Sequence, residues 1–246
     1  MSEMSNKYRR SARKAISLRP DANATAEDLA ASWFGKVRLG LPGETWPFWN
    51  GRPMEAICQI NLRDLPFRPK QLEDLEMITL FMDGLPDSNS RNGEGWCLRA
   101  YPGISLLKPL ARPDMQSELN PLPLVGTLLQ EDYPYDLIVD ESLSEDLNLP
   151  HDMGTKLGGW PTDFMKFDRW ELNEDSMLVA APPSSTDFER GSLDSWLEDP
   201  ARPAYAFQID SLRECNWSWG DEGIAYFGRG TVPGKQDVWA MNWECY

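Results

Sequence analysis

Short runs of apolar residues, each ended by turn residues, recur along the first half of the chain. They lie in 55–65 (EAICQINLRDL), 76–84 (EMITLFMDG) and 96–101 (WCLRAY). Runs of this length, bounded by glycine, proline or polar residues, are typical of β-strands. The polar stretch 83–95 between the last two runs predicts the tip of a β-hairpin.

Three other stretches of the first half and the middle have different patterns. Residues 25–38 (TAEDLAASWFGKVR) predict a short helix, because Thr25 can cap its N-terminus and Asp28 follows three residues later. Residues 39–54 contain so many prolines and glycines that they predict an ordered loop. Residues 105–150, rich in Pro and Leu and then in acidic residues, predict a connector with short helices or irregular structure.

Three stretches of the second half resemble stretches of the first half, in the same order. GGWPTDF (158–164) parallels GLPGETW (40–46), AFQIDSL (206–212) parallels ICQINLR (57–63), and GIAYFGRG (223–230) parallels MITLFMDG (77–84). Chance similarity among common strand residues is the alternative to a duplicated strand-loop-strand unit. We predict an α+β fold, mainly antiparallel sheets with short helices, in a single domain 25–246. Its related halves, 25–104 and 151–246, are joined by an acidic connector.

The net charge of −15 is unevenly distributed along the chain. Residues 1–20 hold six Lys or Arg against one Glu, so the rest of the chain carries about −20. We expect residues 1–24 to form a basic, solvated arm, although a nucleic-acid-binding tail has the same composition. An acidic body repels nucleic acid and attracts basic partners, but acidic surfaces also simply keep cytosolic proteins soluble.

No feature of the sequence predicts export or membrane insertion. The chain contains no run of about 18 apolar residues, and its N-terminus lacks the apolar segment and cleavage site of a signal peptide. We therefore predict a cytoplasmic, unprocessed protein that does not bind membranes. Its four cysteines include no C-x-x-C pair, which favours free thiols.

The sequence contains no recognisable catalytic or metal-binding set. Its one histidine, His151, stands in the connector region, where a histidine is more often a surface residue than a general base. Motifs for zinc, calcium, nucleotide and nucleophilic-serine sites are absent. Asp221 and Glu222 could form a carboxylate pair, but adjacent residues point to opposite faces of a strand. We predict no enzymatic activity, no cofactor and no metal.

Some polar and aromatic residues have two interpretations. Gln59 and Gln208 could face a ligand cleft between the halves, or they could satisfy backbone groups where strands end. Aromatic residues of the proline-rich loops could form a platform for a ligand or partner, or they could seal a core. These aromatic residues are Trp46, Phe48, Trp49 and Trp160.

Four segments of the second half carry a family resemblance. They are Gly158-Gly159-Trp160-Pro161, Phe207-Gln208-Ile209-Asp210, Trp219-Gly220-Asp221-Glu222-Gly223 and Tyr226-Phe227. In this order they resemble the YwqG-like family, a bacterial domain family of unassigned biochemical function. The first half agrees through Trp46-Pro47, Gln59-Ile60 and Leu80-Phe81, and the resemblance covers roughly residues 30–246. The first half has GKVRLGLP where the family often shows a paired-glycine loop, and 105–150 has no match.

The resemblance implies a mixed α and β architecture rich in antiparallel strands. It also implies genes that often lie near secreted polymorphic toxins, with some members that look like immunity proteins. No catalytic residue is established for the family. The resemblance assigns the tryptophan-rich stretch 215–223 (CNWSWGDEG) to the framework, where its glycines suit a turn with positive φ.

These observations predict an immunity protein that binds and neutralises a secreted antibacterial toxin, for which the leading hypothesis is a basic nuclease effector of type VI secretion. An acidic surface would cover the nucleic-acid-binding cleft of the toxin. The predicted contacts lie outside the repeated framework, where partner-specific variation is tolerated. They are Glu131, Asp132, Asp136, Asp140, Glu141, Glu171, Glu174, Asp175, Asp194, Glu198 and Asp199.

Two alternatives remain open. The first is a small-ligand sensor or an enzyme of unknown reaction that uses a cleft between the halves. Its polar groups would be Gln59, Gln208, Asp210 and Asp221. The second is a structural protein without a toxin partner.

Overall fold

Two long strands, β1 (Arg13–Pro20) and β10 (Leu122–Asp132), pair antiparallel at the centre of the fold. The computed structural model describes residues 12–24, 27–87, 90–133, 149–162, 169–172, 178–181, 204–230 and 236–245. In β1 the four residues 15–18 are buried, so both faces of this strand lie inside the protein. In the sequence, such a strand is a short run of mainly apolar residues between polar ends.

Four strands follow on each side of the central pair, and the sheet has ten strands in the order β16-β15-β14-β11-β1-β10-β2-β6-β7-β8. Beside β1 are β11 (Lys156–Gly158), β14 (Ala204–Asp210), β15 (Ile224–Arg229) and β16 (Trp239–Glu244). Beside β10 are β2 (Trp33–Phe34), β6 (Glu55–Asn61), β7 (Met77–Met82) and β8 (Trp96–Tyr101). On each side the four strands therefore follow one another outward from the central pair in sequence order. Each central strand pairs with the set of strands that follows the other central strand in the sequence. Thus β2 follows β1 but pairs with β10, and β11 follows β10 but pairs with β1.

The smaller elements are two-stranded ribbons and single 3-10 turns. Strand β3 (Leu39–Gly40) pairs with β9 (Lys108–Pro109), β4 (Phe48–Trp49) with β5 (Arg52–Pro53), and β12 (Arg169–Leu172) with β13 (Leu178–Ala181). The 3-10 turns are η1 (Lys70–Leu72), η2 (Ile104–Leu106) and η3 (Arg213–Cys215).

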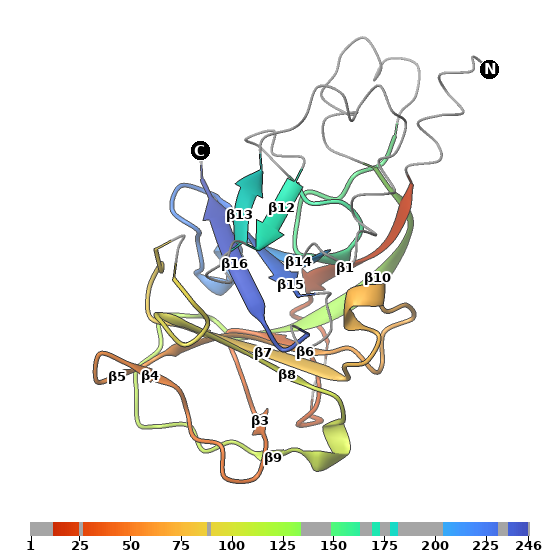
Figure 1. The fold of residues 1–246 in the computed structure, drawn as a ribbon. Helices are drawn as coiled ribbons and strands as arrows, with labels where there is room; N and C mark the ends of the chain where they lie inside the picture. The colour runs from red at the N-terminus through yellow and green to blue at the C-terminus, as the bar shows by residue number, and fades with distance from the viewer. Residues whose placement is uncertain are drawn as a thin grey trace, which may run out of the picture.

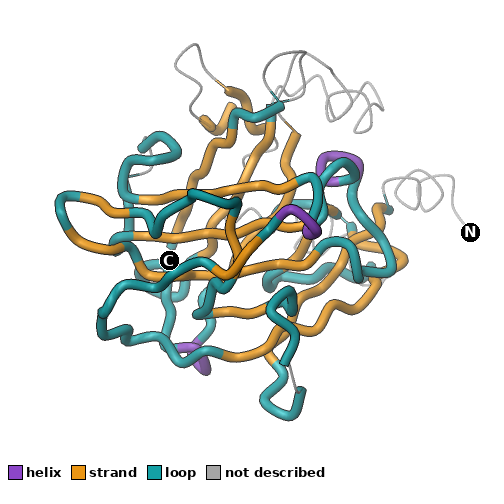
Figure 2. The backbone as a smooth tube through the Cα atoms, turned by 90° about the horizontal axis from the view of Figure 1, so that it is seen from below, coloured by secondary structure: helices purple, strands orange, loops and turns teal. Residues whose placement is uncertain are grey.

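The sheet bends so that its two outer parts face each other across the main core, and it nearly closes on itself. In Figure 1 the β14–β16 group lies above the β6–β8 group, with β1 and β10 joining them, and Figure 2 shows the strands curving around this interior. Trp96 of β8 meets Phe227 of β15 with ring centroids 6.1 Å apart. Trp243 of β16 donates from Nε1 to the carbonyl of Pro86 at 2.8 Å. Buried and partly buried aromatic residues thus connect the two ends of the sheet.

The predicted α+β class is wrong. In the described residues the helical elements are single 3-10 turns, and almost all regular structure is antiparallel strand. The predicted helix at 25–38 fails because Trp33 and Phe34 pair with both β10 and β6, so tertiary pairing overrides the local helical pattern. No helix in the described part of the chain has the length and apolar character needed to cross a membrane.

Two segments expected to be irregular lie at the centre of the sheet. Residues 13–20, assigned by their basic composition to a solvated arm, form β1. Residues 122–132, assigned to the connector, form β10. The apolar residues of both segments are interrupted or flanked by prolines, charges or small polar residues, and such a pattern is also typical of a loop.

Candidate functional site

The structure describes three of the eleven acidic residues predicted to contact a toxin. Glu131 is exposed near the end of β10, whereas the adjacent Asp132 is fully buried. Asp132 is therefore not part of an exposed acidic surface, because successive residues of a strand point to opposite faces. Glu171 lies in β12, of which the backbone is described. The remaining eight fall outside the described residues: Asp136, Asp140, Glu141, Glu174, Asp175, Asp194, Glu198 and Asp199.

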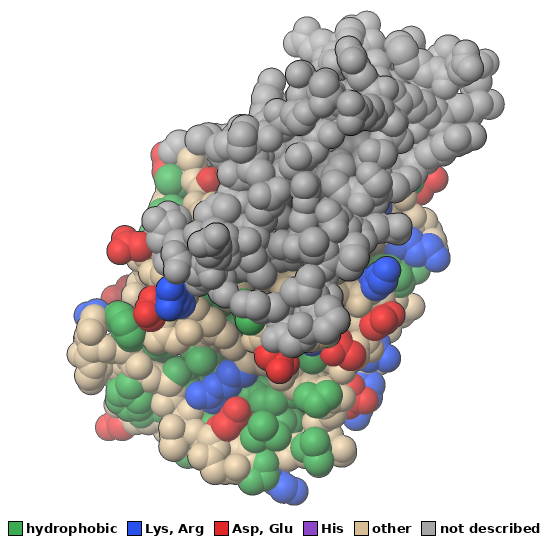
Figure 3. Space-filling view, in the orientation of Figure 1, with side chains coloured by type: hydrophobic (Ala, Val, Ile, Leu, Met, Phe, Trp, Pro, Cys, Tyr) green, Lys and Arg blue, Asp and Glu red, His purple; other side chains and the backbone are tan. Residues whose placement is uncertain are grey.

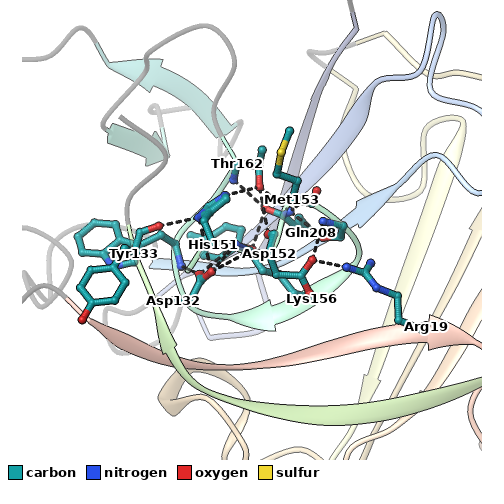
Figure 4. Close-up of polar contacts among 12 residues, drawn as sticks. Arg19, Asp132, Tyr133, His151, Asp152, Met153, Lys156, Thr162 and Gln208 are labelled. Atoms are coloured by element: carbon teal, nitrogen blue, oxygen red, sulfur yellow. Dashed lines mark hydrogen bonds and ion pairs between the residues drawn. The ribbon is translucent and has the colours of Figure 1, made fainter. Parts of the chain in front are cut away.

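Asp132 forms a buried ion pair with Lys156 of β11 (Figure 4). Lys156 Nζ lies 3.2 Å from Oδ1 and 3.0 Å from Oδ2, and both side chains are 0% exposed. The carboxylate also accepts backbone N–H groups of Asp152 at 2.9 Å and of Trp160 at 2.7 Å. Burial lowers the pKa of Lys156, and the negative charge of Asp132 opposes this shift. The cost of burying both charges is thus offset by direct pairing and backbone donors.

The turn after β11 is shaped around this carboxylate. Gly158 and Gly159 have φ angles of +68° and +69°, a region that favours glycine. A Cβ atom added to Gly159 would overlap Oδ2 of Asp132 and lie 2.9 Å from the Cβ of Ala15. Two glycines are therefore needed to bring the backbone, and with it the N–H of Trp160, against Asp132.

His151 belongs to the same cluster and is buried, contrary to the expected surface position. Its side chain is 2% exposed, and Nδ1 lies 3.5 Å from Oδ1 of Asp132. Nδ1 also faces the carbonyl of Tyr133, which can only accept, so Nδ1 carries the proton and Nε2 accepts from the Thr162 hydroxyl at 2.8 Å. Burial, together with the positive charge of Lys156, lowers the pKa of His151 to about 4. The imidazole is therefore neutral at physiological pH.

We expect His151 to make the protein sensitive to acid. The imidazole binds a proton at its ordinary pKa of 6.5 in the unfolded chain but only at about 4 in the folded chain, so stability falls as the pH falls between these values. Between pH 7 and pH 4.5, the wild type should lose about 2 kcal/mol more of its free energy of unfolding than His151→Asn does. Urea unfolding at both pH values measures this difference, and equal losses in the two proteins would contradict the assignment.

Asp152 extends the network toward the surface. Its Oδ1 accepts the N–H of Gly154 at 2.9 Å and pairs with Arg19 of β1, whose side chain is half exposed. Burial raises the pKa of Asp152, but its hydrogen bonds and the positive charge of Arg19 outweigh burial and bring the pKa below its usual value. At Asp210 burial dominates and raises the pKa to about 6, although the N–H of Ser211 opposes the shift. Two nearby carboxyl groups thus have pKa values moved in opposite directions.

Gln59 and Gln208 serve the framework, and the second of their two interpretations is the right one. Both side chains are fully buried. Each accepts a backbone N–H at 2.9 Å and donates to a backbone carbonyl at 2.8 Å. The partners are Arg38 and Leu29 for Gln59, and Thr162 and Gly154 for Gln208. Each glutamine thus bonds to the loops of its own side of the sheet, and Asp221 is exposed in the turn between β14 and β15. These contacts do not form the shared polar cleft of the alternative hypothesis.

The loop aromatic residues mostly seal the core. Trp46 is buried and donates from Nε1 to the carbonyl of Met54 at 2.8 Å. Trp160 is also buried, with the guanidinium of Arg13 3.7 Å from its ring centroid. Phe48 is the exception, because 53% of it is exposed on the β4–β5 ribbon. These residues do not form a shared platform.

The stretch 215–223 is a turn built on a buried tryptophan. Trp219 is fully buried and packs edge-on against Trp217, with ring centroids 5.2 Å apart. The N–H of Gly223 bonds the carbonyl of Trp219 at 2.8 Å, and Gly220 has a φ of +62°. Asp221 is exposed in this turn. The stretch therefore connects β14 to β15 and brings no chemical groups together.

The cluster around Asp132 is the one place in the described residues where an amine, a carboxyl group and an imidazole meet in a buried environment. We name Asp132, His151 and Lys156 the buried triad. No group of three or more His, Cys, Asp or Glu side chains in this described part could hold a metal ion. The four cysteines are free, as predicted. Of the buried triad, sequence reasoning missed Lys156 and assigned Asp132 to the surface.

The comparisons with known proteins do not place the chain in a family. No family model matches it, and no curated protein does. The resemblance to the YwqG-like family therefore remains a prediction from the residues that carry it.

Proposed function

We propose that this protein binds and neutralises a basic protein partner, a secreted antibacterial nuclease toxin, by covering its nucleic-acid-binding cleft. The charge distribution carries the proposal. Between residues 134 and 203 there are 16 acidic and five basic side chains, a net charge of −11 out of −15. This interval lies between β10 and β14, outside most of the ten-stranded sheet. An acidic stretch of this kind attracts a basic cleft that otherwise holds phosphates.

The rest of the chain has a nearly balanced charge. On the face in Figure 3, acidic and basic side chains are interspersed over the described residues. The buried polar side chains of the framework bond mainly to its own backbone, as the two glutamines do. These features support a division in which the sheet is a scaffold and the acidic interval provides recognition.

The first test is co-expression with the product of an adjacent toxin gene. Growth should be rescued and the two proteins should co-purify, because the protein can neutralise the toxin only while it is bound to it. A toxin that stays lethal in the presence of this protein would contradict the proposal.

Charge reversal then tests the electrostatic part. We expect Asp136→Lys, Asp140→Lys and Glu141→Lys combined to slow association with the toxin by about tenfold at low salt and to weaken its salt dependence. Stopped-flow mixing measures both quantities. The matched control reverses three exposed acidic residues of the framework, Glu73, Asp87 and Asp114, and should change association much less. Equal slowing by both sets would show only a general effect of net charge.

A further inference from the structure

The ion pair in the buried triad places a primary amine against a carboxyl carbon. Lys156 Nζ contacts both oxygens of Asp132, at 3.0 and 3.2 Å, so the carbon that carries them is its immediate neighbour (Figure 4). Both side chains are 0% exposed, which keeps competing water away from the two groups. Burial also favours the neutral amine over the ammonium, because it lowers the pKa of Lys156.

The surroundings of the carboxyl group suit nucleophilic attack at its carbon. The N–H groups of Asp152 and Trp160 point at its two oxygens from 2.9 and 2.7 Å. Backbone donors in such positions stabilise the negative charge of a tetrahedral intermediate. The neutral imidazole of His151, 3.5 Å from Oδ1, is placed to relay a proton.

We propose that Lys156 and Asp132 condense to an intramolecular amide that joins β11 to β10. A proton passes from the ammonium to the carboxylate, and the neutral amine attacks Cγ. The bond from Cγ to one oxygen then breaks, and this oxygen leaves as water with two of the three ammonium protons. No oxidant, reductant or other reactant is needed.

Two physical effects favour this reaction over a permanent ion pair. Holding the groups in contact gives an effective concentration on the order of 10⁵ M or more, which drives a condensation that is slow between free molecules. The amide is neutral, so it also removes the desolvation cost of two buried charges. The released water can take the place of the lost oxygen and accept one of the two backbone N–H groups.

The amide would link strands that lie on either side of β1. It would close a loop between positions 24 residues apart. This inference does not depend on the proposed function, because the bond would form in the isolated protein.

Tryptic digestion of the denatured wild-type protein gives a direct test. Between Arg99 and Lys156 the basic residues are Lys108 and Arg112, and both precede proline, so trypsin leaves the stretch from 100 to 156 intact. Trypsin does not cut after an acylated lysine. We expect a single peptide covering 100–166, lighter than its sequence by the mass of one water, and an intact protein lighter by the same mass.

Two variants connect this result to the proposed bond. Lys156→Arg keeps a cation but cannot form the amide, so its intact protein should have the full mass and the peptide 157–166 should be released. Asp132→Asn can condense with loss of ammonia in place of water, so trypsin should still fail to cut after Lys156. Succinimide formation elsewhere would also remove water but would leave this cleavage unchanged. Full mass and complete release of 157–166 from folded wild-type protein, even after prolonged incubation, would overturn the proposal.

Discussion

Relative to the ion-paired wild-type protein, replacing Asp132 with alanine should lower the free energy of unfolding by about 3–5 kcal/mol, the range measured when one partner of a buried ion pair is removed. The variant leaves Lys156 in a site where it is 0% exposed and its amine has lost both contacts. It also removes the acceptor of two backbone N–H groups, those of Asp152 and Trp160. Urea unfolding followed by tryptophan fluorescence measures the loss.

Two variants separate this effect from general damage. Lys156→Met should cost less, roughly 2 kcal/mol, because the carboxylate keeps its backbone donors. Glu131→Ala removes the exposed acidic residue next to Asp132 and should change stability by less than about 0.5 kcal/mol. If Asp132→Ala were as mild as Glu131→Ala, the buried pair would not be a central element of the fold.

Gly159→Ala should cost about 3 kcal/mol, combining roughly 1 kcal/mol for a positive φ with the cost of overpacking. The new methyl group would overlap the carboxylate of Asp132 and lie 2.9 Å from the Cβ of Ala15. Gly84 provides the matched control, because its φ is also +69° but nothing lies within 4 Å of an added Cβ. Gly84→Ala should therefore cost only about 1 kcal/mol. Equal losses in the two variants would show that the contact with Asp132 is unimportant.

The strands that the sequence predicts best are those with strong local patterns. Strands β6, β7 and β8 lie within the three predicted runs, β15 lies within the corresponding stretch of the second half, and β14 overlaps its stretch. The alignment of the halves is displaced by one residue, however. The sequence alignment matches Thr79 with Ala225. In the structure Thr79 pairs with Gln59 and Tyr226 pairs with Gln208, so the residue equivalent to Thr79 is Tyr226. A shift of one residue exchanges the two faces of a strand, and apolar residues on both faces conceal it.

The central strands were missed because their identity depends on distant partners. Strand β10 begins beside Pro121 and contains Pro123, and prolines normally argue against an interior strand. Strand β1 has charged residues at both ends around a short apolar core. Neither sequence pattern predicts a buried strand by itself, because the burial of each strand depends on its pairing with the other.

The buried triad was missed for a similar reason. Asp132 and Lys156 are 24 residues apart, and the strand that lies between theirs in the sheet, β1, comes from the beginning of the chain. A lysine two residues before a glycine pair gives no local sign of burial. The glycine pair belongs to the family resemblance, but only the turn geometry shows that it brings the backbone against the carboxylate of Asp132.

The exchanged pairing of β2 and β11 has a consequence for how the chain is made. While the protein emerges from the ribosome, β2, β6, β7 and β8 can pair with one another, but β1 lacks both of its neighbours until β10 and β11 have been synthesised. Strand β1 can therefore pair only after these later strands exist, and such long-range pairing slows folding. A fragment that ends before β10 would leave β1 without a paired strand, and one that begins after β1 would leave β11 paired with β14 alone. The two sides of this sheet can therefore complete their pairing with the central strands only after both central strands have been synthesised.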